Sequence, residues 1–131
     1  MPNITISADN DLANSLRTFA DVRDAVDAYY KLVTVNPIPG EYYNIGGSYS
    51  CKIGDLLNDL INLSTVKDYL KIEEDPKRIR PIDADLQIPD TSKFSNHTGW
   101  KPEITYEQTI SDLLNYWRNK IKKEEGRFLT R

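Results

Sequence analysis

Tyr116 and Lys120 stand four residues apart, a spacing at which a lysine ammonium can lower the pKa of a tyrosine hydroxyl for proton transfer. The pair lies in a segment whose apolar residues recur at helical spacing, with Tyr116 beside the apolar stripe and Lys120 towards solvent. Such a short spacing also arises by chance in a chain with 8 tyrosines. We therefore interpret both as helix surface residues, and the sequence predicts no catalytic residue in this chain.

Two further residue types with reactive side chains, histidine and cysteine, occur only once each in the sequence. His97 is the only histidine and has no Cys/His companion at the spacing of a zinc site, so we predict a surface helix residue and no metal site. Cys51 is the only cysteine and has no neighbouring base in the sequence, which favours a small buried side chain over a nucleophile. One cysteine cannot form an internal disulfide, and this indicates a reducing, cytoplasmic setting.

Dinucleotide binding by a Rossmann-type domain needs a glycine-rich turn that brings backbone amides against the pyrophosphate. The glycines of this chain lie at positions 40, 46, 47, 54, 99 and 126. They form neither such a turn nor a P-loop. The sequence therefore predicts that this chain by itself binds no cofactor.

The composition describes a single soluble domain. A chain of 131 residues with 39% hydrophobic and 28% charged residues can build one hydrophobic core. Its apolar runs are too short to span a bilayer, and residues 1–10 lack the basic start of a secretory signal. The net charge of −3 argues against nucleic acid as a partner. We expect neither a membrane nor a nucleic-acid partner.

Three segments have apolar residues at the three- and four-residue spacing of amphipathic helices, and the residues that bound a fourth, shorter segment predict another helix. Several of them are bounded by residue types that start or stop helices, such as aspartate or threonine as N-cap and glycine as the left-handed C-terminal cap. The predicted helices follow Asp21 up to the loop at 36–40, span about 53–63, run from 91 to 98 between Asp90 and Gly99, and begin at the capping box of Thr105 and Gln108.

Strands of β-type composition are predicted to be few and short, at 4–6, 41–45 and 87–88. The second of them runs into Gly46 and Gly47, which we expect to permit a turn. Together these elements predict a small, helix-rich α/β domain over residues 1–123, followed by a frayed tail at 124–131.

Four stretches, in order along the chain, resemble the C-terminal, substrate-binding portion of extended short-chain dehydrogenases/reductases, the NAD-dependent epimerase/dehydratase family. They are residues 17–24 (RTFADVRD), 40–47 (GEYYNIGG), 75–83 (DPKRIRPID), and 90–93 (DTSK) with 98–102 (TGWKP). The third stretch and the last are most similar to the branch that holds GDP-mannose 4,6-dehydratase and GDP-4-keto-6-deoxymannose reductase. Of these two, the dehydratase is the better match.

The resemblance implies an enzyme that converts GDP-mannose to GDP-4-keto-6-deoxymannose with NADP. In that family the NADP-binding glycines and the catalytic residues belong to an N-terminal Rossmann part, which this sequence lacks. The chain alone is therefore expected to be inactive and to need the missing Rossmann portion as its partner. Assembly as a homo-oligomer stays open. The alternatives are the same part of the reductase or of another NDP-sugar epimerase or dehydratase, and a freestanding, non-catalytic binding module.

The resemblance also implies a site for a GDP-sugar substrate. Arg80, in a loop stiffened by Pro81, and Arg17 are the expected ligands of the diphosphate, since planar guanidinium groups bind phosphate oxygens in pairs. Asp83, where many relatives carry glutamate, is expected to accept hydrogen bonds from ribose hydroxyls. The alternatives that stay open are ion pairs or charge balance: Arg80 with Asp83 or Asp85, Arg17 with Asp21 or Asp24, and Asp83 with Lys77, Arg78 and Arg80.

Overall fold

The computed structural model describes residues 4–8, 14–74 and 86–124. In chain order the elements are β1 (Ile4–Ala8), β2 (Leu16–Phe19), α2 (Val22–Thr34), β3 (Tyr49–Lys52), α3 (Ile53–Asn62), the 3-10 turn η1 (Lys67–Tyr69), β4 (Leu70–Glu74), β5 (Leu86–Gln87), α4 (Ser92–Thr98) and α5 (Tyr106–Lys123). The predicted small, helix-rich α/β fold is confirmed. Residues 125–131, most of the predicted tail, lie outside the described part of the chain.

The strands form two small sheets. In one, β1 pairs in parallel with β4, so Ile4 lies opposite Leu70. In the other, β2 is central, antiparallel to β3 on one side and parallel to β5 on the other. The central strand carries Arg17, which lies opposite Cys51 of β3 and opposite Gln87 of β5. A residue that sequence reasoning singled out therefore occupies the middle of the larger sheet.

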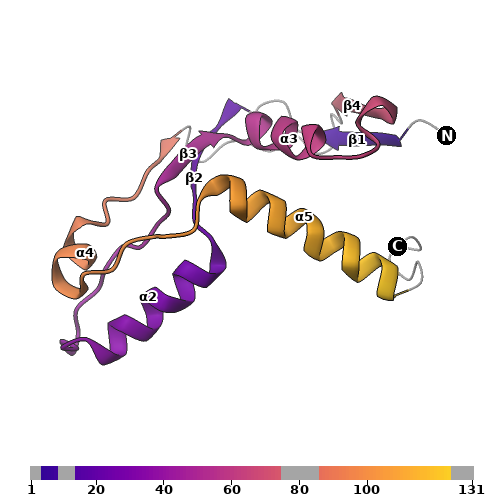
Figure 1. Ribbon diagram of the computed structural model, residues 1–131. Helices are drawn as coiled ribbons and strands as arrows, with labels where there is room; N and C mark the ends of the chain where they lie inside the picture. The colour runs from indigo at the N-terminus through magenta and orange to yellow at the C-terminus, as the bar shows by residue number, and fades with distance from the viewer. Residues whose placement is uncertain (1–3, 9–13, 75–85, 125–131) are drawn as a thin grey trace.

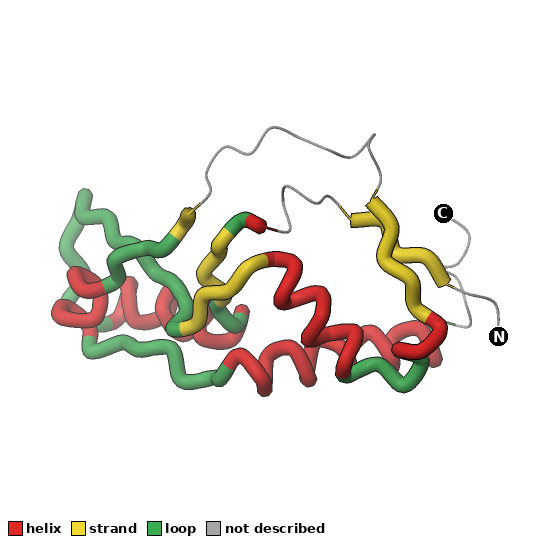
Figure 2. The backbone as a smooth tube through the Cα atoms, turned by 90° about the horizontal axis from the view of Figure 1, so that it is seen from above, coloured by secondary structure: helices red, strands yellow, loops and turns green. Residues whose placement is uncertain are grey.

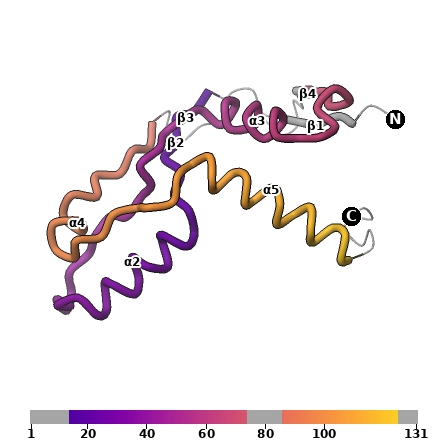
Figure 3. Tube along the Cα trace, in the orientation of Figure 1, coloured from indigo at the N-terminus to yellow at the C-terminus, as the bar shows by residue number. Residues whose placement is uncertain are grey.

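Helices α2 and α5 leave the region of this sheet in different directions, and the β1–β4 pair lies at the far end of α3 (Figure 1). Seen from above, the two sheets are likewise apart from each other, joined on the described chain by α3 and η1 (Figure 2). The traced chain shows the loop after α2 running beside α4 (Figure 3). Hydrogen bonds join this loop to α4, since Lys93 of α4 donates to Glu41 Oε2 at 2.5 Å and to Tyr42 O at 3.0 Å.

Two separate hydrophobic clusters pack the helices together and against the larger sheet. The first lies between α2 and α4 and consists of Ala28, Phe94 and Trp100, with Leu32, Tyr43 and Ile45 packed around them. The second joins β3, α3 and α5 through Cys51, Tyr106 and Ile110, with Phe19, Leu56 and Leu60 around them. The predicted burial of Cys51 is confirmed, since only 6% of the residue is exposed.

The helix boundaries follow the predicted caps. Asp21 accepts a hydrogen bond from Arg23 N at 2.9 Å at the start of α2, and Thr105 Oγ1 accepts one from Gln108 N at 3.2 Å at the start of α5. Gly99 ends α4 in the left-handed conformation, with φ of 70°. Among the described residues, no helix is both long and apolar enough to cross a membrane.

The strand predicted at 41–45 is wrong, because the segment forms no ladder in the structure. Its alternation is nonetheless real. Tyr43 and Ile45 pack against the first cluster, whereas Tyr42 is 82% exposed. The β-type pattern here reflects packing of one edge of an extended segment against helices, without a neighbouring strand to pair with.

The two glycines after that segment act through close approach rather than through a turn. Positive φ angles in the described chain occur at Asn36, Gly40 and Gly99, and not at Gly46 or Gly47. A Cβ atom on Gly47 would lie 1.6 Å from Phe19 O, and one on Gly46 would lie 2.5 Å from Pro89 Cγ. These positions need glycine so that the segment can pass over the end of β2 and reach β3.

Candidate functional site

Arg17 lines an open groove beside the larger sheet. The groove has a volume of about 520 Å³ and is bordered by Arg17, Thr18, Asn44, Leu86, Gln87, Ile88 and Pro89. The arginine is half-buried, and its Nη1 donates a hydrogen bond to Leu16 O at 3.1 Å. The site thus combines a cation fixed on a strand with neighbouring amides and exposed apolar carbons.

The chemistry of this lining suits an anion attached to a larger polar body. A guanidinium group donates paired hydrogen bonds to phosphate or carboxylate oxygens. The side-chain amides of Asn44 and Gln87 can donate and accept hydrogen bonds, while Leu86 and Ile88 are 59% and 58% exposed and offer apolar contact. No described group of His, Cys, Asp and Glu side chains could hold a metal ion.

Thr18 ties together the three strands that build the groove. Its Oγ1 shares a hydrogen bond with Ser50 Oγ of β3 at 2.8 Å and donates one to Gln87 O of β5 at 3.2 Å. These contacts fix the register that sets Arg17 opposite Gln87. The position of the arginine therefore depends on a threonine that sequence reasoning did not single out.

Arg80 and Asp83 lie outside the described residues. The strand that follows them is described, and it pairs directly with the strand that carries Arg17. Asp83 precedes Gln87 by four positions in the sequence, and Arg80 precedes it by seven. The described chain resumes at Leu86, the first residue of β5, which borders the groove.

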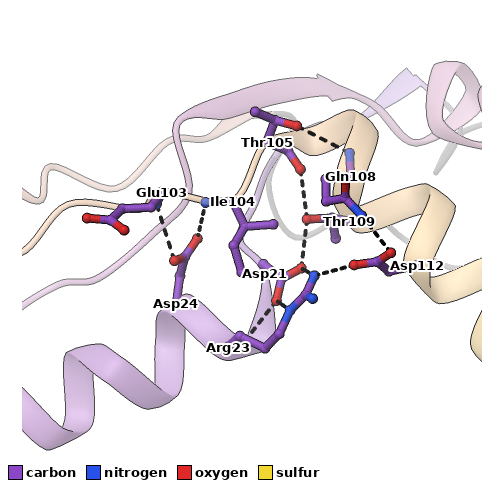
Figure 4. A network of polar contacts seen from close by, with 9 residues as sticks. All are labelled: Asp21, Arg23, Asp24, Glu103, Ile104, Thr105, Gln108, Thr109 and Asp112. Carbon is purple, nitrogen blue, oxygen red and sulfur yellow. Dashed lines mark hydrogen bonds and ion pairs between the residues drawn. The ribbon is translucent and has the colours of Figure 1, made fainter.

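The alternative in which Arg17 pairs with Asp21 is not what the structure shows, because Arg23 occupies that carboxylate (Figure 4). Arg23 donates from Nε at 2.9 Å and from Nη2 at 2.8 Å, and Thr109 of α5 donates its hydroxyl at 2.8 Å. Arg23 also forms an ion pair with Asp112 of α5, with 2.8 Å between Arg23 Nη2 and Asp112 Oδ2. These hydrogen bonds hold the pKa of the buried Asp21 carboxyl well below its usual range, and the bond from the Arg23 side chain has the largest effect.

The second acid, Asp24, is also engaged elsewhere (Figure 4). Its two carboxylate oxygens accept hydrogen bonds from Glu103 N at 3.2 Å and Ile104 N at 3.0 Å. Its backbone carbonyl accepts a third bond from Trp100 Nε1 at 3.2 Å, and only 6% of the residue is exposed. Asp21 and Asp24 together fasten the first turn of α2 to the chain around the start of α5, so we assign them structural roles.

The remaining reactive side chains have structural partners. His97 is half-buried rather than a simple surface residue, because its Nδ1 shares a short hydrogen bond with the Tyr43 hydroxyl and its Nε2 donates to Asn36 O at 2.9 Å. Burial raises the pKa of the Cys51 thiol, which disfavours a nucleophilic thiolate. Tyr116 is 55% exposed on α5, as predicted, and Lys120 Nζ lies 5.7 Å from the centre of its ring.

The sequence singled out Arg17, which lines the groove, but not the two amides beside it, Asn44 and Gln87. For Asn44 a signal existed. It alternates with Tyr43 and Ile45, so it had to face away from the apolar side of its segment. For Gln87 the deciding fact is the pairing of β5 with β2, which joins residues about 70 positions apart and has no local signature.

Comparisons with known proteins bear on this site. The sequence model of the family described as GDP-mannose 4,6 dehydratase matches residues 8–113. GDP-6-deoxy-D-mannose reductase of Pseudomonas aeruginosa is 32% identical over 82% of this chain and 34% of its own length. The dTDP-D-glucose 4,6-dehydratase of Mus musculus is 28% identical over 78% of this chain and 29% of its own length. The chain thus spans about a third of the length of these relatives.

A solved structure leads to the same group of proteins. The structure of RMD from Pseudomonas aeruginosa complexed with NADPH superimposes with a TM-score of 0.72 and 26% sequence identity. The match covers 90% of this chain and 36% of that one. The described fold is therefore that of one portion of an extended dehydratase, reductase or epimerase.

Proposed function

Because this chain belongs to the GDP-mannose 4,6 dehydratase family, we propose that it is the nucleotide-sugar-binding portion of such an enzyme and that the Arg17 groove receives the diphosphate. The observation that carries this proposal is the parallel register of β2 and β5, which sets Arg17 opposite Gln87. That register places the strand after Arg80 and Asp83 along the same groove.

In this proposal the two arginines bind the diphosphate from two different segments. Arg17 approaches from the central strand and Arg80 from the segment that precedes β5, each with a planar donor set that matches phosphate oxygens. Asp83 accepts hydrogen bonds from the vicinal hydroxyls of the ribose. The side-chain amides of Asn44 and Gln87 in the groove then form hydrogen bonds with the other polar groups of the ligand.

The role of this portion is positional. Binding energy from the nucleotide and the diphosphate, which do not react, orients the hexose for chemistry performed by groups of the rest of the enzyme. The described strand-to-helix junctions offer no glycine-rich turn: β2 leads to α2 through Ala20 and Asp21, and β3 meets α3 directly. A dinucleotide therefore does not fit here, and we assign NADP to the Rossmann portion of a complete enzyme.

The reaction that we propose for the complete enzyme is conversion of GDP-mannose to GDP-4-keto-6-deoxymannose. A second candidate is the reductase that acts on a GDP-6-deoxy sugar, which the 32% identity with the Pseudomonas aeruginosa reductase favours. Both candidates use the same guanosine diphosphate group. The substrate site proposed for this chain is therefore common to both.

Isothermal titration calorimetry of the 131-residue protein with GDP, GDP-mannose, UDP-glucose and guanosine tests the binding role. We expect GDP and GDP-mannose to bind at least about tenfold more tightly than guanosine, which lacks the diphosphate. Equal affinity for guanosine and GDP would contradict a diphosphate site. Tighter binding of UDP-glucose than of GDP-mannose would keep the site but overturn the choice of base.

A second assay tests the absence of turnover. With NADP and GDP-mannose, the purified chain should consume no substrate, because the catalytic groups are assigned to the Rossmann portion. Cofactor-dependent loss of GDP-mannose, followed by chromatography, would overturn that assignment.

A further inference from the structure

Helix α4 holds segment 41–45 through two side chains that lie one helical turn apart. Lys93 donates hydrogen bonds to the first two residues of the segment. His97, four positions later on the same side of the helix, shares a hydrogen bond with the hydroxyl of Tyr43. Because the segment lies outside both described sheets, contacts of side chains hold it in place, and strand pairing does not.

The partners of His97 fix the tautomer of its imidazole ring. Nε2 lies 2.9 Å from the backbone carbonyl oxygen of Asn36, which can only accept a hydrogen bond, so Nε2 carries the proton. In the neutral ring Nδ1 is then an acceptor, and the Tyr43 hydroxyl donates to it. His97 therefore forms a bridge between the chain just after α2 and the segment that carries Tyr43.

The anchored tyrosine determines where the next side chain points. Tyr43 packs against Phe94 with 5.4 Å between the ring centres, and Ile45 joins the same hydrophobic cluster. Successive side chains of an extended chain point to opposite sides, so Asn44 is directed away from this cluster. It is exposed there and borders the Arg17 groove. A rotation of the segment that released Tyr43 would also withdraw the Asn44 amide from the groove.

We propose that His97 is a positioning residue for the ligand, because its hydrogen bond with Tyr43 keeps the Asn44 amide turned towards the groove. The inference rests on the proposed function, which supplies the nucleotide sugar that this amide meets. His97 and Tyr43 are not among the described residues that line the groove. They therefore act on the ligand through Asn44 and not by contact.

Two substitutions at His97 separate the two arms of the bridge. In His97→Asn the side-chain oxygen is bonded to Cγ, as Nδ1 is in histidine, and can accept from Tyr43. In His97→Gln the amide lies one bond further out, and its nitrogen can donate to Asn36 O as Nε2 does. Calorimetry of the 131-residue chain should show GDP binding about fivefold weaker in His97→Gln and less than about twofold weaker in His97→Asn.

The matched control is Asn96→Ala, at an exposed position of the same helix, which should leave GDP affinity unchanged. In an Asn44→Ala background, His97→Gln should cause no further loss of affinity, because the group that His97 positions is gone. An undiminished loss in that background would make His97 a general structural residue and overturn the proposal. Wild-type affinity in His97→Gln, or equal losses in His97→Asn and His97→Gln, would overturn it as well.

A measurement without ligand separates this inference from the diphosphate site. In heteronuclear NMR spectra of the free chain, the side-chain amide signals of Asn44 should shift in His97→Gln and keep their positions in His97→Asn. Unchanged Asn44 signals in His97→Gln would overturn the positioning role. The expected shifts in a chain whose wild type binds no GDP would confirm the bridge from His97 to Asn44 and refute the ligand of the proposed function.

Discussion

Asp24 and Arg17 lie seven positions apart, and their surroundings differ in kind. Asp24 is buried, and its carboxylate accepts two backbone amides from the chain before α5. Arg17 is half-buried at the edge of an open groove lined by amides and exposed apolar carbons. We call these two regions the α2 clamp, formed by Asp21, Asp24 and their partners, and the Arg17 groove.

The difference between the two regions separates stability from binding. In the α2 clamp each acid accepts hydrogen bonds from donors of the same chain, so removing one leaves part-buried donors without their acceptor. In the Arg17 groove the polar groups border solvent, where a ligand can reach them. Substitutions in the clamp should therefore change the free energy of unfolding, and those at Arg17 should change ligand affinity.

The largest effect is expected from Asp24→Ala. Loss of the carboxylate leaves the part-buried amides of Glu103 and Ile104 without their acceptors and the first turn of α2 without its link to this loop, and the free energy of unfolding should fall by about 3 kcal/mol. Urea denaturation followed by circular dichroism measures it. Asp27→Ala on the same helix removes only a surface pair with Lys31 and should cost less than about 1 kcal/mol. Similar losses for both variants would abolish the distinction between clamp and surface.

A pH-dependent effect is expected from Asp21, whose folded pKa is lowered. A lowered pKa means that its contribution is complete above the unfolded pKa of about 3.9 and is lost as the pH falls from there towards the folded value. The stability advantage of the wild type over Asp21→Asn should therefore shrink between about pH 5 and pH 2, by at most about 1.4 kcal/mol per pH unit. Denaturation curves at several pH values measure this difference. An advantage that is constant with pH would contradict the ion-paired Asp21.

A smaller effect is expected from Thr18→Val, which keeps the side-chain shape and removes the hydroxyl that joins β2 to Ser50 and to Gln87 O. The free energy of unfolding should fall by about 1 kcal/mol. Because the same contacts hold the register of the groove, GDP affinity should fall as well. Thr65→Val, at an exposed loop position, is the control and should change neither. Wild-type stability and wild-type affinity in the Thr18→Val protein would show that the groove does not depend on these contacts between strands.

Local chemistry was enough to predict the helices. Asp21, Gly99 and Thr105 act at helix ends through contacts within a few residues, and each cap lies where the sequence placed it. The sheets were harder to predict. Strands β1 and β4 pair across more than 60 positions, and β2 and β5 across about 70, so short strands such as Leu16–Phe19 have no signal of their own.

In the candidate site, too, some residues could be predicted from the local sequence and others depend on long-range contacts. Arg17 could be predicted because it lies in a stretch that resembles a known family, whereas its neighbour Gln87 depends on sheet pairing. The role of Asp24 was missed for the same reason. Its acceptor function appears only when Glu103 and Ile104, 79 and 80 positions away, fold back onto α2. Sequence shows which residue types can do chemistry, but long-range contacts decide which of them are already occupied.

We propose that Arg17 and Arg80 bind one diphosphate together, and a double-mutant cycle of GDP affinity tests this most directly. Calorimetry on the wild type, Arg17→Ala, Arg80→Ala and the double variant should show each single loss at about 1.5–3 kcal/mol. The two losses should depart from additivity by at least about 0.5 kcal/mol. Lys122→Ala, which removes an exposed charge on α5, should leave the affinity unchanged. Wild-type affinity in Arg17→Ala, or strictly additive losses in the double variant, would contradict a shared diphosphate site.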